Sequence, residues 1–227
     1  MTVIDLSKTP IRDLNQRLHD LNGADRTNEW RITNPNGEHA IAAGLNAPIN
    51  VQIDGPVGYY CGGMNKEAMI TINGHCGWGV GENIMSGFIR VKGNASESVG
   101  ASGVGGLIVI EGDASSRCGI SMKGVDIVVT GSVGHMSAFL AQKGHLVVCG
   151  DVGPDLGASI YETIIYVQGE VGRLGADCIE KEMTPEHREN LTRLLRQAEV
   201  DAEPTRFRRY GSARKLYHFN VDHADAY

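Results

Sequence analysis

Seven glycines recur in this chain at a fixed interval of 19 residues, and this period restricts the fold more than any other feature. They are Gly55, Gly74, Gly93, Gly112, Gly131, Gly150 and Gly169. A constant period over most of a sequence is typical of proteins in which each repeat stacks on the next. A glycine at the same place in every repeat indicates a bend or a close backbone approach that leaves no room for a Cβ atom.

Apolar residues occupy fixed positions around each marker glycine. The residues four and two before it, and two after it, are apolar in every repeat, as in Ile70, Ile72 and Cys76 around Gly74. This alternation predicts a strand with one buried face. Nineteen residues are too few for a strand, a helix and two turns, but they suffice for one coil of three short strands. We therefore predict an all-β fold, a parallel β-helix of about seven 19-residue coils with short capping helices at both ends.

Composition agrees with a narrow rod and excludes several functions. The 227 residues include 30 glycines, and only 6% are aromatic, so the interior is filled by small side chains. A net charge of −6 and a pI near 5.7 argue against nucleic acid and anionic membranes as partners. The chain has no apolar run that could span a bilayer and its start lacks a signal-peptide core, so we expect a cytoplasmic protein.

Both ends of the chain differ from the repeat, and we divide it into residues 1–34, 35–180 and 181–227. Thr9 and Pro10 predict a helix start, with an apolar face that includes Leu14, Leu18 and Leu21. Thr184 and Pro185 predict a second helix with Leu191, Leu194, Leu195 and Ala198 on one face. These helices are expected to cap the open ends of the solenoid or to dock a partner.

After Pro204 the tail RFRRYGSARKLYHF alternates basic and aromatic residues. Such a pattern is compatible with RNA binding. Because the chain is acidic overall, we favour the alternative that the aromatic residues dock on the solenoid or on a neighbouring subunit.

A column of residues three before each marker glycine is expected to point outward. It is polar in the first three coils and apolar in the last four: Gln52, Thr71, Arg90, Val109, Val128, Val147 and Tyr166. Leu107 and Ile164 extend the apolar part. Contiguous exposed apolar surface marks an interface, so the candidate interface is Leu107, Val109, Val128, Val147, Ile164 and Tyr166. The alternative is that the C-terminal helix or tail folds back over it.

Residues that usually carry chemistry are dispersed over the repeat. The five cysteines form no CxxC pair and are interpreted as buried apolar residues: Cys61, Cys76, Cys118, Cys149 and Cys178. The histidines show no metal-ligand spacing, and the stretch GHCGWGVGEN does not match a dinucleotide-binding motif. The residue before each marker glycine varies from Asp54 through Lys92 to Cys149, which could not repeat a calcium site. We expect no catalytic, cofactor-binding or metal-binding residue here.

The glycine columns resemble those of a known domain. Strings such as GGLIVIEGDASSRCGISMKG and KGHLVVCGDVGPDLGASIYE are similar to the GXGXG domain of the glutamate synthase large subunit, over about residues 35 to 178. The resemblance implies a right-handed β-helix without catalytic residues that braces an amidotransferase domain and an FMN-binding barrel. A free-standing chain looks most like the GXGXG subunit of three-part relatives such as N-methylglutamate synthase, which converts methylamine and glutamate to N-methylglutamate and ammonia.

The same resemblance implies partners and cofactors outside this chain. The expected partners are a class-II amidotransferase-like subunit and an FMN-binding glutamate synthase-like subunit, which would carry FMN and an iron–sulfur cluster if one is present. Two alternatives remain open: the similar subunit of formylmethanofuran dehydrogenase, and a binding scaffold with no enzyme attached.

Overall fold

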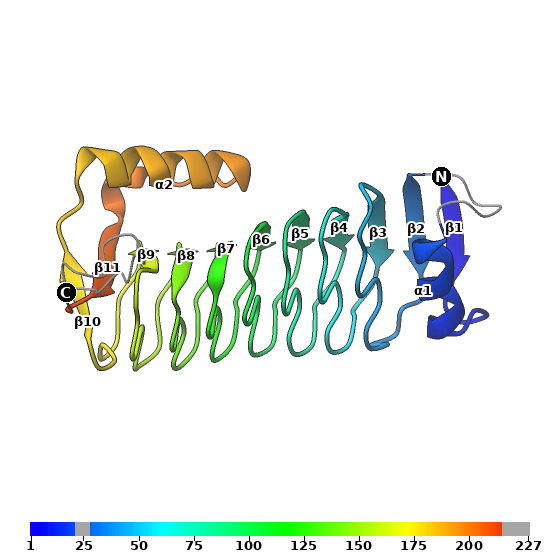
Figure 1. Ribbon diagram of the computed structural model, residues 1–227, viewed down its shortest axis with the longest axis horizontal. Coiled ribbons are helices and arrows are strands. Elements are labelled where there is room, and N and C mark those ends of the chain that lie inside the picture. The colour runs from blue at the N-terminus through cyan, green and yellow to red at the C-terminus, as the bar shows by residue number, and fades with distance from the viewer. Residues whose placement is uncertain (21–27, 215–227) are drawn as a thin grey trace, which may run out of the picture.

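The chain is a rod built around one long sheet, seen in the computed structural model, which describes residues 1–20 and 28–214 (Figure 1). Its sheet has the strand order β1-β2-β3-β4-β5-β6-β7-β8-β9-β11-β10, and the first nine strands are parallel. These nine are β1 (Thr2–Asp5), β2 (Glu29–Thr33), β3 (Asn50–Asp54), β4 (Met69–Ile72), β5 (Phe88–Val91), β6 (Leu107–Ile110), β7 (Lys123–Val129), β8 (Lys143–Val148) and β9 (Ile164–Val167).

Strand register follows the 19-residue period from β3 to β9. Ile53 pairs with Ile72, and Ile72 pairs with Val91, so equivalent residues of successive coils stand side by side. The predicted parallel β-solenoid of about seven coils is confirmed. Each coil contributes one regular strand where we expected three. The other sides of the coil form no named strand: they are joined by isolated bridges, such as Val57 to Cys76 and Cys76 to Ala95, and by further backbone hydrogen bonds between neighbouring coils.

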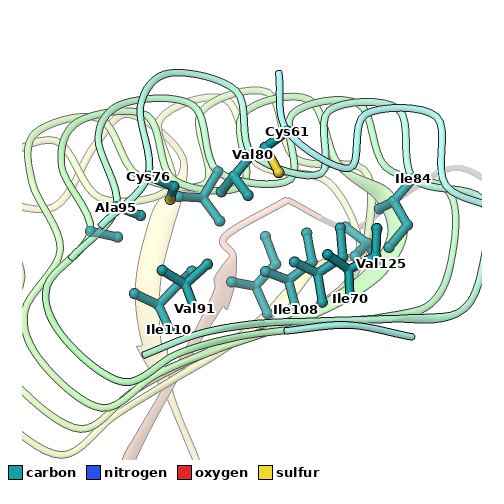
Figure 2. Packing of buried hydrophobic residues seen from close by; sticks show 14 of the residues in the cluster. Cys61, Ile70, Cys76, Val80, Ile84, Val91, Ala95, Ile108, Ile110 and Val125 are labelled. Carbon is teal, nitrogen blue, oxygen red and sulfur yellow. The ribbon is translucent and has the colours of Figure 1, made fainter. Parts of the chain in front are cut away.

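The interior of the solenoid is a continuous column of small apolar side chains. Figure 2 shows Ile70 and Ile108 from the sheet facing Val80 and Cys61 from the opposite side of the coil. All four of these residues are completely buried. Stacking of identical positions lets β-branched residues pack on β-branched residues along the rod, which explains why so few aromatic residues are found in the core.

The marker glycines are required by the close approach of successive coils. At Gly131 an added Cβ would stand 2.7 Å from the carbonyl oxygen of Gly112 and would also meet the Asp113 carboxylate. The Gly131 N–H donates to this same Gly112 oxygen at 3.0 Å, so the two backbones cannot move apart without losing a hydrogen bond. A second glycine column adopts left-handed backbone, as at Gly81 (φ +66°) and Gly100 (φ +62°).

Two strands and a helix close the N-terminal end. β1 and β2 extend the sheet beyond the 19-residue repeat, so the segment expected to be a helical extension also contributes strands. Helix α1 (Ile11–His19) begins one residue later than predicted, with Pro10 as its N-cap, and buries Leu14 and Leu18 against the core. Leu21, predicted to line the same face, lies outside the described residues.

The C-terminal end is closed by strands. β11 (Arg208–Ser212) lies antiparallel between β9 and β10 (Cys178–Lys181), after the short 3-10 helix η1 (Pro204–Arg206). Tyr210 and Cys178 are part of the main core and cover its last coil. The predicted second helix is present as α2 (Pro185–Gln197), with Thr184 as its N-cap, but it does not cap this end. It runs along the side of the rod, over the sheet (Figure 1).

Candidate functional site

The candidate interface on β6 to β9 is covered by the chain's own helix. Val109, Val128, Val147 and Tyr166 are completely buried, and Leu107 and Ile164 are half-buried. They pack against the apolar face of α2 and against the segment that follows it: Leu191, Leu194, Leu195, Ala198 and Phe207. The prediction that this stripe binds a partner is therefore corrected, and the alternative of an intrachain contact holds. An amphipathic helix and an apolar sheet face must each be buried against another element, and here they are buried against each other.

The point where the outward column turns from polar to apolar marks the end of α2. Arg90 donates from Nη2 to the carbonyl oxygen of Ala198 at 2.9 Å, and it forms ion pairs with Glu111 (2.9 Å) and Glu199 (3.1 Å). A cation at a helix C-terminus satisfies free carbonyl groups and favours the helix dipole. Thr71 and Gln52, earlier in the column, are beyond the reach of α2 and remain polar.

A polar network fastens the middle of α2 to the sheet. His145 Nδ1 lies 2.7 Å from Asp126 Oδ1, and His145 Nε2 lies 2.7 Å from Asn190 Nδ2. Arg193 donates to Asn190 Oδ1 at 2.6 Å, which orients the amide so that its N–H points at His145. His145 Nε2 is then an acceptor, and its Nδ1–H donates to Asp126. Tyr166 OH contacts His187 Nδ1 at 3.2 Å beside it.

The His145–Asp126 pair has the spacing of a general base and its orienting carboxylate, but it cannot act as one in this arrangement. The nitrogen that would accept a proton from a substrate already accepts from Asn190. The network therefore positions the helix.

Two open grooves lie beside α2. One of about 450 Å³ is lined by charges of both signs, including Arg90, Glu111 and Arg206. The other, of about 390 Å³, is lined by Leu107, Asp126 and Arg193 among others. Neither brings a nucleophile to a free base.

Four of the five cysteines are buried in the core and Cys149 is half-buried, and all five are unreactive thiols. Burial raises the pKa of Cys76 and Cys118 to about 12 and that of Cys149 and Cys178 to about 11, and it raises the pKa of Cys61 further. Because the thiolate is the nucleophile and metal ligand, these groups are poorly suited to either role. Over residues 1–20 and 28–214, no group of three or more His, Cys, Asp or Glu side chains could hold a metal ion.

An exposed aromatic cluster, which sequence reasoning did not single out, lies on the turns of the first coils. Tyr59 stacks on His39 with ring centroids 4.4 Å apart, and its centroid is 6.2 Å from Trp78 and 6.4 Å from Tyr60. Tyr59 and Trp78 are 19 residues apart and occupy the same place in neighbouring coils. We call His39, Tyr59, Tyr60 and Trp78 the aromatic cluster.

The described part of the basic tail docks on the rod. Phe207 packs under α2 and Tyr210 packs in the core. Arg208 and Arg209 donate to the carbonyl oxygens of Gly169 and Glu182, and Arg214 pairs with Asp177 at 2.6 Å. Docking on the solenoid is therefore confirmed for these residues, while Lys215, Tyr217 and Phe219 lie outside the described residues.

Comparison with known proteins places the chain in a family. It is 56% identical over 228 residues to Protein GlxC of Rhizobium meliloti (strain 1021), and the match covers 100% of both chains. The chain belongs to the GlxC family. No family model matches it.

A solved structure shares the fold of this GlxC-family chain. It is a chain of the formyltransferase/hydrolase complex FhcABCD from Methylorubrum extorquens, determined with methylofuran. The TM-score is 0.57, over 88% of this chain and 85% of the other, with 16% identity. At this identity the likeness shows the fold alone. In the described residues of the GlxC-family chain, no helix is long and apolar enough to cross a membrane.

Attachment of α2 in the GlxC-family chain should weaken in acid. Burial, and then the charge of Arg209, lowers the pKa of His187 below its usual 6.5. The other groups around the His187 ring are the Tyr166 hydroxyl, which contacts it, and the charged or titratable side chains of Glu186, His145 and Lys181. The native state then binds fewer protons than the unfolded state, so stability present above pH 6.5 decreases as pH falls through the lowered pKa. Chemical denaturation of the wild type and His187→Gln between pH 5 and 8 should show a shallower dependence below pH 6.5 in the variant. Equal slopes would contradict the assignment.

Proposed function

We propose that the chain is a non-catalytic structural subunit of a hetero-oligomeric enzyme complex related to glutamate synthase. The observation that supports this most is that the described residues form a rod with a solid aliphatic core. The His145–Asp126 pair outside that core, which has general-base spacing, is held by the chain's own helix. A rod of stacked coils offers long side surfaces for other chains. The family relationship to GlxC and the repeat's resemblance to the GXGXG domain support the same proposal.

The proposed complex places the chemistry in other subunits. A class-II amidotransferase-like chain would handle ammonia transfer, and an FMN-binding glutamate synthase-like chain would hold the flavin. N-methylglutamate synthesis from methylamine and glutamate is the reaction that we propose for the assembly. This chain would hold the two partners at a fixed separation.

A second candidate is a subunit of a formyl-transferring complex. The observation that favours it is the shared fold with a chain of FhcABCD. The two candidates differ in their partners, since the second requires a pterin-binding or formyl-transferring chain and no FMN barrel.

Co-expression distinguishes these functions. The tagged chain is produced together with an amidotransferase-like and an FMN-barrel protein, and the complex is isolated by affinity and size exclusion. We expect co-elution in a fixed ratio, with FMN in the purified complex. In a parallel co-expression with a pterin-binding chain, co-elution with that chain would favour the second candidate, and a chain that elutes alone in both experiments would leave neither complex supported.

Flavin should be absent from the isolated chain. The purified protein is expected to be colourless and to show no absorbance near 450 nm after incubation with FMN and gel filtration. Stoichiometric FMN retained by this chain alone would contradict the scaffold role.

A further inference from the structure

The aromatic cluster is exposed although nothing in the coil requires aromatic residues at its positions. Tyr59, Tyr60 and Trp78 have exposed fractions of 47%, 46% and 42%. The places of Tyr59 and Trp78 in later coils are taken by Glu97 and Ser116. These coils have the same backbone hydrogen bonds, so the rings do not support the turn.

The rings are held in fixed positions. Tyr59 lies over Gly77 and Tyr60 lies over Gly79: an added Cβ on either glycine would stand 2.8 Å from the ring above it. His39 stacks on Tyr59 with an interplanar angle of 11°. Rigid rings of this kind lose little conformational entropy when they are covered, and Tyr and Trp are enriched among the residues that dominate binding energy.

The surroundings of the cluster are acidic. The turn segments that stack here are residues 38–45, 57–64, 76–83 and 95–102, and they contain Glu38, Glu82 and Glu97 but no Lys or Arg. Glu82 Oε2 lies 2.9 Å from the point where a Gly79 Cβ would stand, so its carboxylate lies close to the Tyr60 ring. Within the part of the chain that the structure describes, none of the three glutamates forms an ion pair.

We propose that the aromatic cluster and these glutamates form a docking surface for a protein subunit that presents an arginine-bearing segment. A guanidinium group stacks on aromatic rings and donates hydrogen bonds from its edge to a carboxylate, so it matches both features at once, whereas the compact ammonium of lysine cannot stack flat on a ring. The partner is one of the other subunits of the complex, and in this the inference rests on the proposed function.

A second copy of this chain is a weaker match. Three of its described basic C-terminal residues, Arg208, Arg209 and Arg214, are engaged within their own chain. The docking surface also lies on the early coils, away from the half of the rod that carries α2 (Figure 1).

The test uses substitutions that the repeat itself contains. Ser116 and Ser98 stand in later coils where Tyr59 and Tyr60 stand in the first, so Tyr59→Ser/Tyr60→Ser/Trp78→Ser should preserve the coil. The control is Tyr161→Ser, because Tyr161 is 51% exposed and lies on another turn of the rod. Affinity for the purified amidotransferase-like and FMN-barrel subunits is measured by biolayer interferometry, and melting temperature is measured in parallel.

The triple variant should have the same melting temperature as the wild type, and it should bind one subunit at least roughly tenfold more weakly. Tyr161→Ser should bind that subunit with wild-type affinity. Glu82→Gln/Glu97→Gln should weaken the same interaction and reduce its salt dependence. A photo-crosslinking residue at position 60 should attach to an arginine-bearing segment of that subunit.

Three results would overturn this inference. Normal affinity of the triple variant would contradict the proposed docking surface but not the proposed complex. Crosslinking to a second copy, or to a segment without arginine, would contradict the partner's chemistry. Failure of the wild type to bind either subunit would instead contradict the proposed function, on which this inference rests.

Discussion

Replacing Gly131 by valine should destabilise the protein by on the order of 4 kcal/mol, a large share of the stability of an ordinary folded domain. An added Cβ would stand 2.7 Å from the Gly112 carbonyl oxygen and 2.8 Å from its carbon, and both atoms belong to backbone held by the coil-to-coil hydrogen bonds. Neither coil can yield without breaking those hydrogen bonds. The free energy of unfolding is measured by urea denaturation followed by circular dichroism.

Gly211 provides the matched control. It is a buried glycine of β11, but the atoms nearest to an added Cβ are Lys181 Cδ at 3.6 Å and Thr163 O at 3.8 Å, which are ordinary contacts. Gly211→Val should therefore cost far less than Gly131→Val. Equal losses in the two variants would show that the spacing between coils adjusts more freely than the hydrogen bonds of the marker glycines imply.

The coiled part of the fold could be predicted because one short pattern determines all of it. Residues such as Ile70 and Ile72 recur with their glycine in every coil, so a single interpretation of the repeat fixes strand direction, register and core together. The cysteine interpretation follows from the same regularity. Cys61 and Cys118 occupy one column and both lie buried in the core.

The ends could not be predicted in this way, because the repeat stops there. Trp30 of β2 pairs with Thr2 on one side and Val51 on the other, and neither neighbour is 19 residues away. β11 carries the sequence RRYGS, whose two arginines hide a strand from any search for alternating apolar residues. The segment is recognisable as a strand only from its pairing with β9 and β10.

The apolar stripe on β6 to β9 was visible in the sequence, but what covers it was not. Periodicity shows that Val128 and Val147 point outward and need a cover, and it shows that Leu191 and Leu194 form an apolar helix face. It does not say that one covers the other. A signal was present in Arg90, which interrupts the column where the helix ends, and in the helix length. Thirteen residues of α2 extend roughly 20 Å, which suffices to cross four strands spaced about 4.8 Å apart.

Substituting Val128 and Val147 by lysine should destabilise the packing of α2 against the sheet. Both side chains are completely buried between the sheet and α2, where an ammonium group would lose its hydration among apolar side chains. Each substitution should destabilise the packing of α2 on the sheet by on the order of 4 kcal/mol. The helix is expected to detach, because the solenoid core beneath has its own cluster of contacts. Limited proteolysis should then cleave residues 182–207 while the coils remain resistant.

Thr71→Lys tests whether this result is specific to the covered part of the sheet. Thr71 occupies the same outward column on β4, beyond Arg90 and beyond the end of α2, and it is only partly buried. A lysine there can reach solvent, so the melting temperature and the protease pattern should match the wild type. If Thr71→Lys and the Val128 and Val147 variants behave alike and all resist cleavage, α2 does not cover the stripe in solution. The apolar surface on β6 to β9 would then again be available to a partner.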